Sequence, residues 1–450
     1  MSDASGREAG AGRPFAAALA REGRMNTPRR ADRQRRAWVW TGVALLAVLG
    51  VCTRLAYLAW AANHPGFDWI DPDYYLAKVA AITDGDAWRW SLQATEYRHR
   101  GRVFHLPPLY SLYLSTAALL PGPLARAAAI GHSLLFGAGV VAIYAIGANL
   151  HSRRAGVIAA AMMVLAPNSI HIAPIFLHEQ LYMPLLLTAF AVLTWLLAGD
   201  RGIAWWAVGG AVFGFAILTR SMPLYYLPLA MGGIVWSTDH RPTATRQIVW
   251  LALGAGVVTL TYSVWLSAQV GRWVFVENHA SISMTAYTRI IRSAPPSPLE
   301  ESLALVTAFA ERPWEFLQTF AAFLRSNFRP AADRWTELYV PSLTGTARAL
   351  VHAYARVMTD AGFVLAVLLA PFGVVLARRR LPSLVLAIWP PLVALLTTLA
   401  AYGGPRYRGA FEWMLYVYLA IVLAGAWRRP SRREVGLAAF ASALGVLLVW

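Results

Sequence analysis

Apolar residues fall along the chain in runs of roughly 17–25, and short polar or basic gaps separate the runs. A helix of about 20 apolar residues is long enough to cross the hydrocarbon core of a bilayer. Because such runs recur along the whole chain, they predict an all-α polytopic membrane protein with about eleven transmembrane helices. The predicted spans are residues 37–62, 126–150, 156–174, 180–198, 203–219, 223–237, 247–267, 361–377, 383–402, 410–427 and 435–450.

Composition and charge also indicate a membrane protein. Of the 450 residues, 58% are hydrophobic and 14% are charged, whereas soluble domains average about 25% charged residues. The net charge of +17 comes from arginine clusters in the short gaps and before the first run. This distribution is the positive-inside pattern, and it argues against a nucleic-acid partner. The clusters in the gaps are Arg153–Arg154, Arg241 with Arg246, Arg378–Arg380 and Arg428–Arg433.

The basic gaps also set the predicted orientation, because they are expected on the cytoplasmic side. Residues 1–36, rich in alanine, glycine and arginine, are predicted to be a disordered basic cytoplasmic tail. No small-residue cleavage site follows the first apolar run, so we expect that run to be retained as a span. Residues 37–450 then form one transmembrane domain in the plasma (inner) membrane, with outer segments at 63–125 and 268–358.

Both outer segments contain stretches with helical character. Residues 71–86 begin with Asp-Pro and end near Asp-Gly, which predicts a short helix. Residues 107–122 are bounded by prolines and are too short for a span, and 297–328 carries apolar residues at helical spacing with charges between them. We therefore expect juxtamembrane helices along the membrane surface in both segments.

The signatures of soluble enzymes are missing from the sequence. There is no GxxxxGK[ST] phosphate loop, no HExxH and no paired CxxC, and the single cysteine, Cys52, cannot form an intrachain disulfide. No strong ligand spacing appears, so no metal ligands and no cofactor are assigned, although the outer carboxylates are chemically able to bind a divalent metal. The GxxxG in "GGAVFG" (209–214) lies within a span and predicts close packing of two helices.

Ionisable residues at the predicted outer boundary are better candidates for chemistry, because charge near hydrocarbon is costly without a partner or a role. Asp71 and Asp73 are candidate general bases, and helix capping is the alternative for them. His178 and Glu179 stand between strongly apolar flanks, with a solvated loop tip as the alternative. Lys78 follows the aspartates on the same predicted helix and is either a substrate ligand or part of a solvated face.

Three arginines and a histidine complete the candidates. Arg220 either extends its charge to the interface or binds an anion. Arg406 and Arg408 lie on the predicted outer side, where the positive-inside rule does not explain them, so they are candidate ligands of a phosphate. His105 is equally compatible with a loop position and with a substrate contact.

The order of these segments resembles a known family. An acidic Tyr-Tyr segment after the first run is followed by "HLPPLYSLYL", an arginine-led span, "LHEQLYMPLLL", "GFAILTRSMPLYYLP" and a late "PRYRGAFEWML". This order is similar to the GT-C integral-membrane glycosyltransferases. Within them it is most similar to the group of protein O-mannosyltransferases and lipid A aminoarabinose transferases, that is, glycosyltransferase family 39 and its relatives. The resemblance covers residues 37–425.

The resemblance implies a GT-C-like bundle that uses a polyprenyl- or dolichyl-phosphate-linked sugar as its donor. It implies an inverting hexosyl or pentosyl transfer to a glycan, lipid or protein acceptor on the outer face, without a nucleotide. Asp71 matches the family's catalytic aspartate before the aromatic pair Tyr74–Tyr75. Asp73 competes with it, because Pro72 stands where the family often has an acidic residue directly after the aspartate.

The later motifs of the family also have counterparts in this chain. Glu179 falls where the family has an acidic residue, usually Asp, after the third span. The arginines of the late RYR-type segment would face the carrier phosphate. The aminoarabinose-transferase branch has a Glu-Lys pair where this chain has His105–Leu106–Pro107, which disfavours that substrate. The predicted catalytic residues are Asp71, Asp73 and Glu179, and the predicted substrate-binding residues are Tyr74, Tyr75, Lys78, His105, His178, Arg220, Arg406 and Arg408.

Two other classes of function compete with the enzyme. A transporter or flippase for a lipid-linked or anionic substrate would use the same boundary residues, and it predicts polar residues deep within spans and repeat symmetry. The spans are nearly free of acidic residues and no repeat is evident, which favours the enzyme. A membrane subunit that only binds a partner would tolerate substitution of the acidic loop residues.

Overall fold

A computed structural model describes residues 13–61, 96–99, 102–173, 177–199, 201–237, 241–276, 306, 309–329, 343–377, 381–399, 405–425 and 431–449. Within these residues the regular secondary structure is helical apart from one short hairpin, and the predicted class, an all-α polytopic membrane protein, is confirmed. The helices are α1 (Arg13–Ala61), α3 (Leu109–Ala118), α4 (Leu124–Leu150), α5 (Arg153–Leu165), α6 (Pro167–His171), α7 (Glu179–Leu197), α8 (Ile203–Ile217), α9 (Met222–Ser237), α10 (Arg241–Val270), α13 (Pro313–Phe328), α15 (Gly345–Ala355), the π-helix η2 (Arg356–Ala361), α16 (Gly362–Ala377), α17 (Leu381–Ala387), α18 (Trp389–Leu399), α19 (Pro405–Leu423) and α20 (Arg432–Val449).

A helix lies at each of the eleven predicted apolar runs, as far as the structure describes them. Five helical stretches are long and apolar enough to cross a membrane on their own: Ala37–Ala61, Leu124–Leu150, Glu179–Leu197, Pro242–Val270 and Gly345–Ala377. Four shorter apolar helices accompany them within the described residues, at Ile203–Ile217, Met222–Trp236, Ser383–Leu399 and Glu434–Gly445.

Two of the predicted spans are not single helices. The run predicted at 156–174 is broken at Ala166, whose backbone is extended before Pro167 opens α6. A residue that precedes proline is pushed out of the helical region, which explains the break. The run predicted at 383–402 is likewise divided between α17 and α18, and α18 has two prolines in its first turn.

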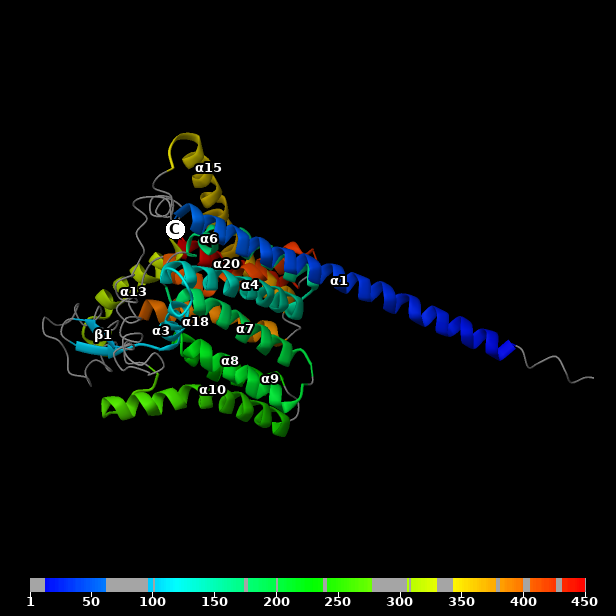
Figure 1. Ribbon diagram of the computed structural model, residues 1–450, viewed down its shortest axis with the longest axis horizontal. Coiled ribbons are helices and arrows are strands. Elements are labelled where there is room, and N and C mark those ends of the chain that lie inside the picture. The colour runs from blue at the N-terminus through cyan, green and yellow to red at the C-terminus, as the bar shows by residue number, and fades with distance from the viewer. Residues whose placement is uncertain are drawn as a thin grey trace, which may run out of the picture.

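The first helix is longer than the sequence predicted. Residues 1–36 were expected to be a disordered tail, yet α1 begins at Arg13 and continues without a break to Ala61. Alanine and arginine are both strong helix formers, which accounts for the extension. Figure 1 shows the N-terminal part of α1 projecting well beyond the other helices.

The helices form one bundle whose two ends differ in composition. The strands β1 (Glu96–His99) and β2 (Arg102–His105) pair antiparallel, with Glu96 opposite His105, and lie at the end away from the start of α1 (Figure 1). We call this the hairpin end. The end of α4 with the start of α5, which carries Arg153 and Arg154, and the end of α9 with the start of α10 lie at the opposite end.

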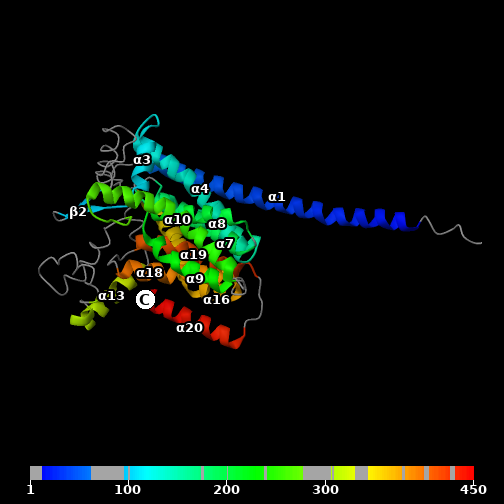
Figure 2. The ribbon, with the colours of Figure 1, turned by 90° about the horizontal axis from the view of Figure 1, so that it is seen from below.

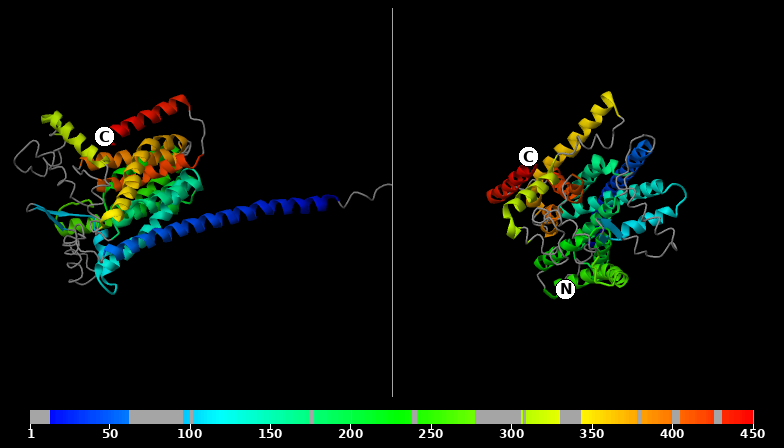
Figure 3. Two further views of the ribbon diagram at one scale, coloured as in Figure 1. Left: turned by 90° about the horizontal axis from the view of Figure 1, so that it is seen from above. Right: turned by 90° about the vertical axis from the view of Figure 1, so that its left-hand side faces the viewer.

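The hairpin end is tied to the bundle through α3. The Leu109 N–H donates to the Leu218 carbonyl over 3.0 Å, and the Tyr262 hydroxyl donates to the Leu106 carbonyl over 3.3 Å. The segment after β2 is therefore fixed against the ends of α8 and α10. Figure 2 and Figure 3 show α20 at one edge of the bundle and α1 with α4 at another.

Helices α8 and α10 pack very closely. A Cβ atom on Gly210 would overlap the carbonyl oxygen of Leu251, and one on Gly254 would overlap the carbonyl oxygen of Ala207. Both positions therefore require the absence of a side chain. The close packing predicted from "GGAVFG" is confirmed, and α10 is the partner helix.

The second predicted outer segment contains the amphipathic helix α13. Trp314 and Leu317 near its start are exposed, whereas Asn327 near its end is buried and donates to Thr397 Oγ1 over 3.2 Å. The helix predicted within 297–328 is thus confirmed for Pro313–Phe328, and its end is fixed to α18.

Candidate functional site

The first turn of α7 carries a buried ion pair. Glu179 is the first residue of α7, and Arg220 lies in the link between α8 and α9. Arg220 Nη1 donates to Glu179 Oε1 over 3.1 Å, and the two side chains are 11% and 6% exposed. Opposite charges balance each other here in a region where little water enters.

Two more residues of the same segment border this pair. His178 Nε2 lies 3.6 Å from Glu179 Oε1. The ring of Tyr182, one turn further along α7, has its centroid 5.9 Å from the guanidinium carbon of Arg220. The structure thus brings together three predicted site residues, His178, Glu179 and Arg220, from two separate sequence motifs.

A second arginine contacts the same helix end from α1. Arg54 is 2% exposed, and its Nη2 donates to Gln180 Oε1 over 2.6 Å. Its Nη1 donates to the carbonyl of Ser169 in α6, also over 2.6 Å, and its guanidinium lies 4.7 Å from the centroid of the Phe136 ring. Gln180 in turn donates from Nε2 to the Ile172 carbonyl.

Aromatic side chains from α3 and α4 stack beside this arginine. The ring of Tyr113 lies 5.1 Å from that of His132, and the Tyr110 hydroxyl lies 3.4 Å from His132 Nε2. Burial raises the pKa of the Tyr113 phenol above its ordinary value, and the positive charge of Arg54 offsets only part of that rise. The Tyr113 hydroxyl stays protonated and donates to the Ala128 carbonyl over 2.8 Å.

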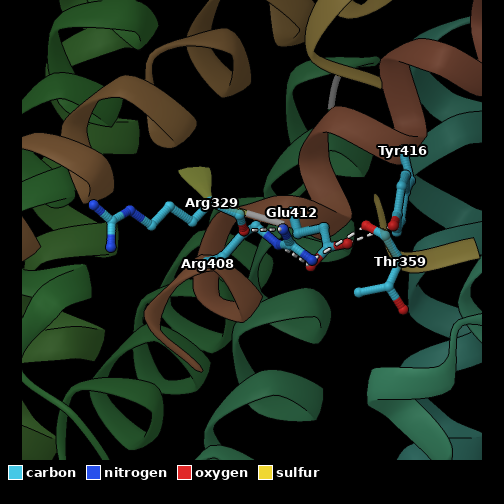
Figure 4. A network of polar contacts seen from close by, with 5 residues as sticks. All are labelled: Arg329, Thr359, Arg408, Glu412 and Tyr416. Carbon is cyan, nitrogen blue, oxygen red and sulfur yellow. Dashed lines mark hydrogen bonds and ion pairs between the residues drawn. The ribbon is translucent and has the colours of Figure 1, made fainter. Parts of the chain in front are cut away.

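Arg408 belongs to a separate buried network, shown in Figure 4. Its Nε donates to Glu412 Oε2, its Nη1 to the Arg329 carbonyl and its Nη2 to the Thr359 carbonyl, each over 3.2 Å. The Tyr416 hydroxyl donates to the other oxygen of Glu412. Thr359 lies in the π-helix η2, and the irregular turn presents its carbonyl to the arginine.

This network holds the Arg408 guanidinium inside the protein. The side chain is 0% exposed, and all three of its nitrogens donate to acceptors within the protein. Arg220 keeps some exposure, at 11%. Of these two arginines, Arg220 has the more exposed side chain.

Of the remaining predicted site residues, the structure describes the side chain of one, His105, and not those of the others. His105 is buried at the end of β2. Arg406 lies in the first turn of α19, and its side chain falls outside the described residues. The residues of the acidic loop also lie outside the described residues: Asp71, Asp73, Tyr74, Tyr75 and Lys78.

The Arg220 guanidinium offers hydrogen-bond donors of the kind that can bind an anion such as a phosphate. A guanidinium fixed by a carboxylate presents its donors in a set direction, and a helix N-terminus such as that of α7 carries partial positive charge. Among the described residues, no group of three His, Cys, Asp or Glu side chains is arranged to hold a metal ion.

Sequence analysis overlooked three ionisable residues within the apolar runs. Arg54, His132 and Glu412 lie in α1, α4 and α19, and all three are buried. The available signal was the rarity of such residues in membrane spans, where a charge faces the bundle interior and pairs with a partner.

Comparison with known proteins gives a family-model match over part of the chain and a similar fold. Residues 105–266 match the family model described as dolichyl-phosphate-mannose-protein mannosyltransferase. A search of curated proteins by sequence finds no match. The family match includes His105, the His178–Glu179 pair and Arg220.

Solved structures agree on the fold. The chain is similar to the oligosaccharyltransferase of Archaeoglobus fulgidus in the apo form, with a TM-score of 0.55, 16% sequence identity and coverage of 91% of this chain and 55% of that one. The archaeal oligosaccharyltransferase AglB from Archaeoglobus fulgidus, in complex with an inhibitory peptide and a dolichol-phosphate, gives a TM-score of 0.50, 15% identity and coverage of 92% and 55%. The chain thus spans about half the length of these proteins. The predicted resemblance to GT-C glycosyltransferases is confirmed.

Proposed function

We propose that the chain is a membrane glycosyltransferase that moves a sugar from a polyprenyl-phosphate carrier to an acceptor hydroxyl on the outer face of the membrane. The observation that carries the proposal is the buried Glu179–Arg220 pair at the N-terminus of α7. It lies within the segment that matches a family of lipid-phosphate-sugar-dependent transferases.

The reaction is an inverting displacement at C1 of the sugar. The acceptor oxygen bonds to C1 while the bond between C1 and the phosphate oxygen breaks. A carboxylate, Asp71 or Asp73, takes the proton of the acceptor hydroxyl. The phosphate leaves as a monoester dianion on its lipid, and a guanidinium stabilises the charge that develops on it.

Arg220 is the proposed phosphate ligand among the described residues. Glu179 holds its guanidinium in place, so Glu179 acts through Arg220 and leaves proton transfer to the acidic loop. His178 and Tyr182 border the same charges and help to define the phosphate position. Arg406 is a second proposed ligand, whereas Arg408 serves the internal network with Glu412.

Transport remains the alternative, because buried charged or polar residues do lie within spans. Arg54 and Glu412 are the examples that a transporter would predict. Both are held by several protein partners, however, as residues that fix neighbouring helices would be. The family match of residues 105–266 favours the enzyme.

The test is transfer by the purified protein in lipid nanodiscs with radiolabelled polyprenyl-phosphate monosaccharides and a membrane extract as the acceptor source. We expect wild-type protein to transfer one of the sugars, and Asp71→Asn or Asp73→Asn to lose that transfer. Full transfer by both variants would contradict the proposed base. Movement of intact donor across vesicles, without transfer, would favour the transporter.

A further inference from the structure

The first two residues of α7 contact two different arginines. Glu179 accepts from Arg220, and the next residue, Gln180, accepts from Arg54. Successive residues of a helix point about 100° apart, so the two contacts hold α7 from two sides. The start of α7 is therefore fixed between α1 and the link from α8 to α9.

Arg54 also holds the segment that leads into α7. Its bond to the Ser169 carbonyl fixes α6, and Ser169 Oγ donates to the carbonyls of Met163 and Ala166 across the break in the span. Gln180 closes the arrangement through its bond to the Ile172 carbonyl. A single guanidinium thus joins the helix break to the first turn of α7.

The chemistry of these contacts is unusual for a residue that only fills space. Arg54 is buried within a membrane helix, where an uncompensated guanidinium is costly. In the part of the chain that the structure describes, its partners are a carbonyl, an amide oxygen and an aromatic face, and no carboxylate pairs with it. An apolar residue would pack here without that cost, so the directional fork of arginine has a use at this position.

We propose that Arg54 is a positioning residue, which acts through Gln180 to set the first turn of α7 so that Glu179 meets Arg220. The effect on catalysis rests on the proposed function. The claim that the Arg54–Gln180 bond sets the first turn of α7 does not. Without the Arg54–Gln180 bond, the first turn loosens and the Arg220 guanidinium loses its fixed direction toward the carrier phosphate.

The variants are Arg54→Met, which removes both bonds, Arg54→Lys, which keeps the charge but loses the fork, and Gln180→Met, which removes the acceptor for Arg54 together with the Gln180 bond to the Ile172 carbonyl. The matched control is Asn149→Leu. It breaks a partly buried contact between α4 and α7, the 3.2 Å bond from Asn149 Nδ2 to Thr194 Oγ1, near the other end of α7. If Arg54→Met does not fold, Gln180→Met still tests the inference, because it leaves the bond to Ser169 intact.

The first measurement requires no substrate. In a Cys52→Ala background, His178→Cys supplies a thiol beside Glu179, and its rate of reaction with a water-soluble maleimide is measured in nanodiscs. We expect Arg54→Met, Arg54→Lys and Gln180→Met each to raise this rate by about tenfold, as the loss of one charge-assisted hydrogen bond implies. Asn149→Leu should leave the rate unchanged. Wild-type rates in the Arg54 and Gln180 variants would overturn the inference.

The second measurement uses the transfer assay and the native His178. The KM for the polyprenyl-phosphate sugar should rise about tenfold in Gln180→Met, with a smaller change in kcat. If kcat in Gln180→Met falls only in proportion to the fraction of folded protein, as expected for Asn149→Leu, the Arg54–Gln180 bond only stabilises the fold. That result would overturn the positioning role. Absence of transfer and of donor binding by wild-type protein would refute the proposed function, and the thiol measurement would still decide the inference.

Discussion

Glu179 and Arg220 stand 41 residues apart in the sequence, yet Arg220 Nη1 lies 3.1 Å from Glu179 Oε1 at the N-terminus of α7. The pair joins two motifs that the sequence offered as separate candidates. It fixes the direction of the Arg220 guanidinium and places an opposite charge beside it in a region of low exposure. The expected consequences concern donor binding, bundle stability and the response to pH.

Removal of the carboxylate should weaken catalysis without preventing folding. Glu179→Gln keeps an acceptor for Arg220 but loses the charge that balances it, so we expect kcat/KM for the lipid donor to fall about 10- to 100-fold. The measurement is steady-state transfer in nanodiscs, with thermal unfolding as the control for folding. Wild-type kcat/KM in Glu179→Gln would show that the pair has no part in catalysis.

Removal of Arg408 should act on stability instead. Arg408→Met leaves Glu412 buried with its charge unpaired, which costs about 3–5 kcal/mol. We expect a clear fall in Tm in detergent, and recovery of most of it in the double variant Arg408→Met/Glu412→Leu, in which no buried charge remains. Weakened donor binding at unchanged Tm would restore the phosphate-binding role that the sequence predicted for Arg408.

The bundle was predictable because membrane spans depend on apolar length. Every predicted run holds a helix, and the glycines of "GGAVFG" meet α10 as the close-packing motif predicted. The break at Ala166 could have been predicted from Pro167, but one proline hardly changes the mean hydropathy of a whole apolar run. The hairpin of β1 and β2 was missed, since four-residue strands carry almost no periodic signal.

The sequence indicated which residues could form the site, but not which of them contact one another. Glu179 and Arg220 were both candidates, but nothing in one sequence says that they meet. Arg54 was missed because it lies inside a long apolar run, and its partners Gln180 and Ser169 are neutral residues without a motif. Arg408 was assigned to an outer gap, although α19 begins at Pro405 and turns Arg408 into the bundle.

Close packing of α8 and α10 should tolerate no side chain at Gly210. Gly210→Ala places a Cβ against the Leu251 carbonyl, so we expect a destabilisation of about 1–3 kcal/mol, visible as a lower Tm. The matched control is Gly232→Ala in α9, whose added Cβ would meet nothing within 4 Å. Equal Tm values for the two variants would contradict the packing.

The buried Tyr113 phenol should make stability fall at high pH. Its pKa is raised by burial in the folded state, so above about pH 10 the unfolded chain loses a proton that the folded protein keeps. The free energy of unfolding therefore falls as pH rises through that range. Tyr113→Phe removes this contribution, and its Tm should decline less steeply than that of wild type when both are followed upward from about pH 9. Parallel declines would show that Tyr113 ionises equally in both states.

Donor binding tests the central claim most directly, because it needs neither the acceptor nor turnover. The affinity of a polyprenyl-phosphate monosaccharide is measured for wild type, Arg220→Met and Arg220→Lys in nanodiscs. We predict that wild type binds the donor and that its affinity falls about 10- to 100-fold in Arg220→Met. Arg220→Lys should retain part of the affinity, because it keeps the charge without the fork. Failure of wild type to bind any such donor, or equal binding by Arg220→Met, would contradict the account.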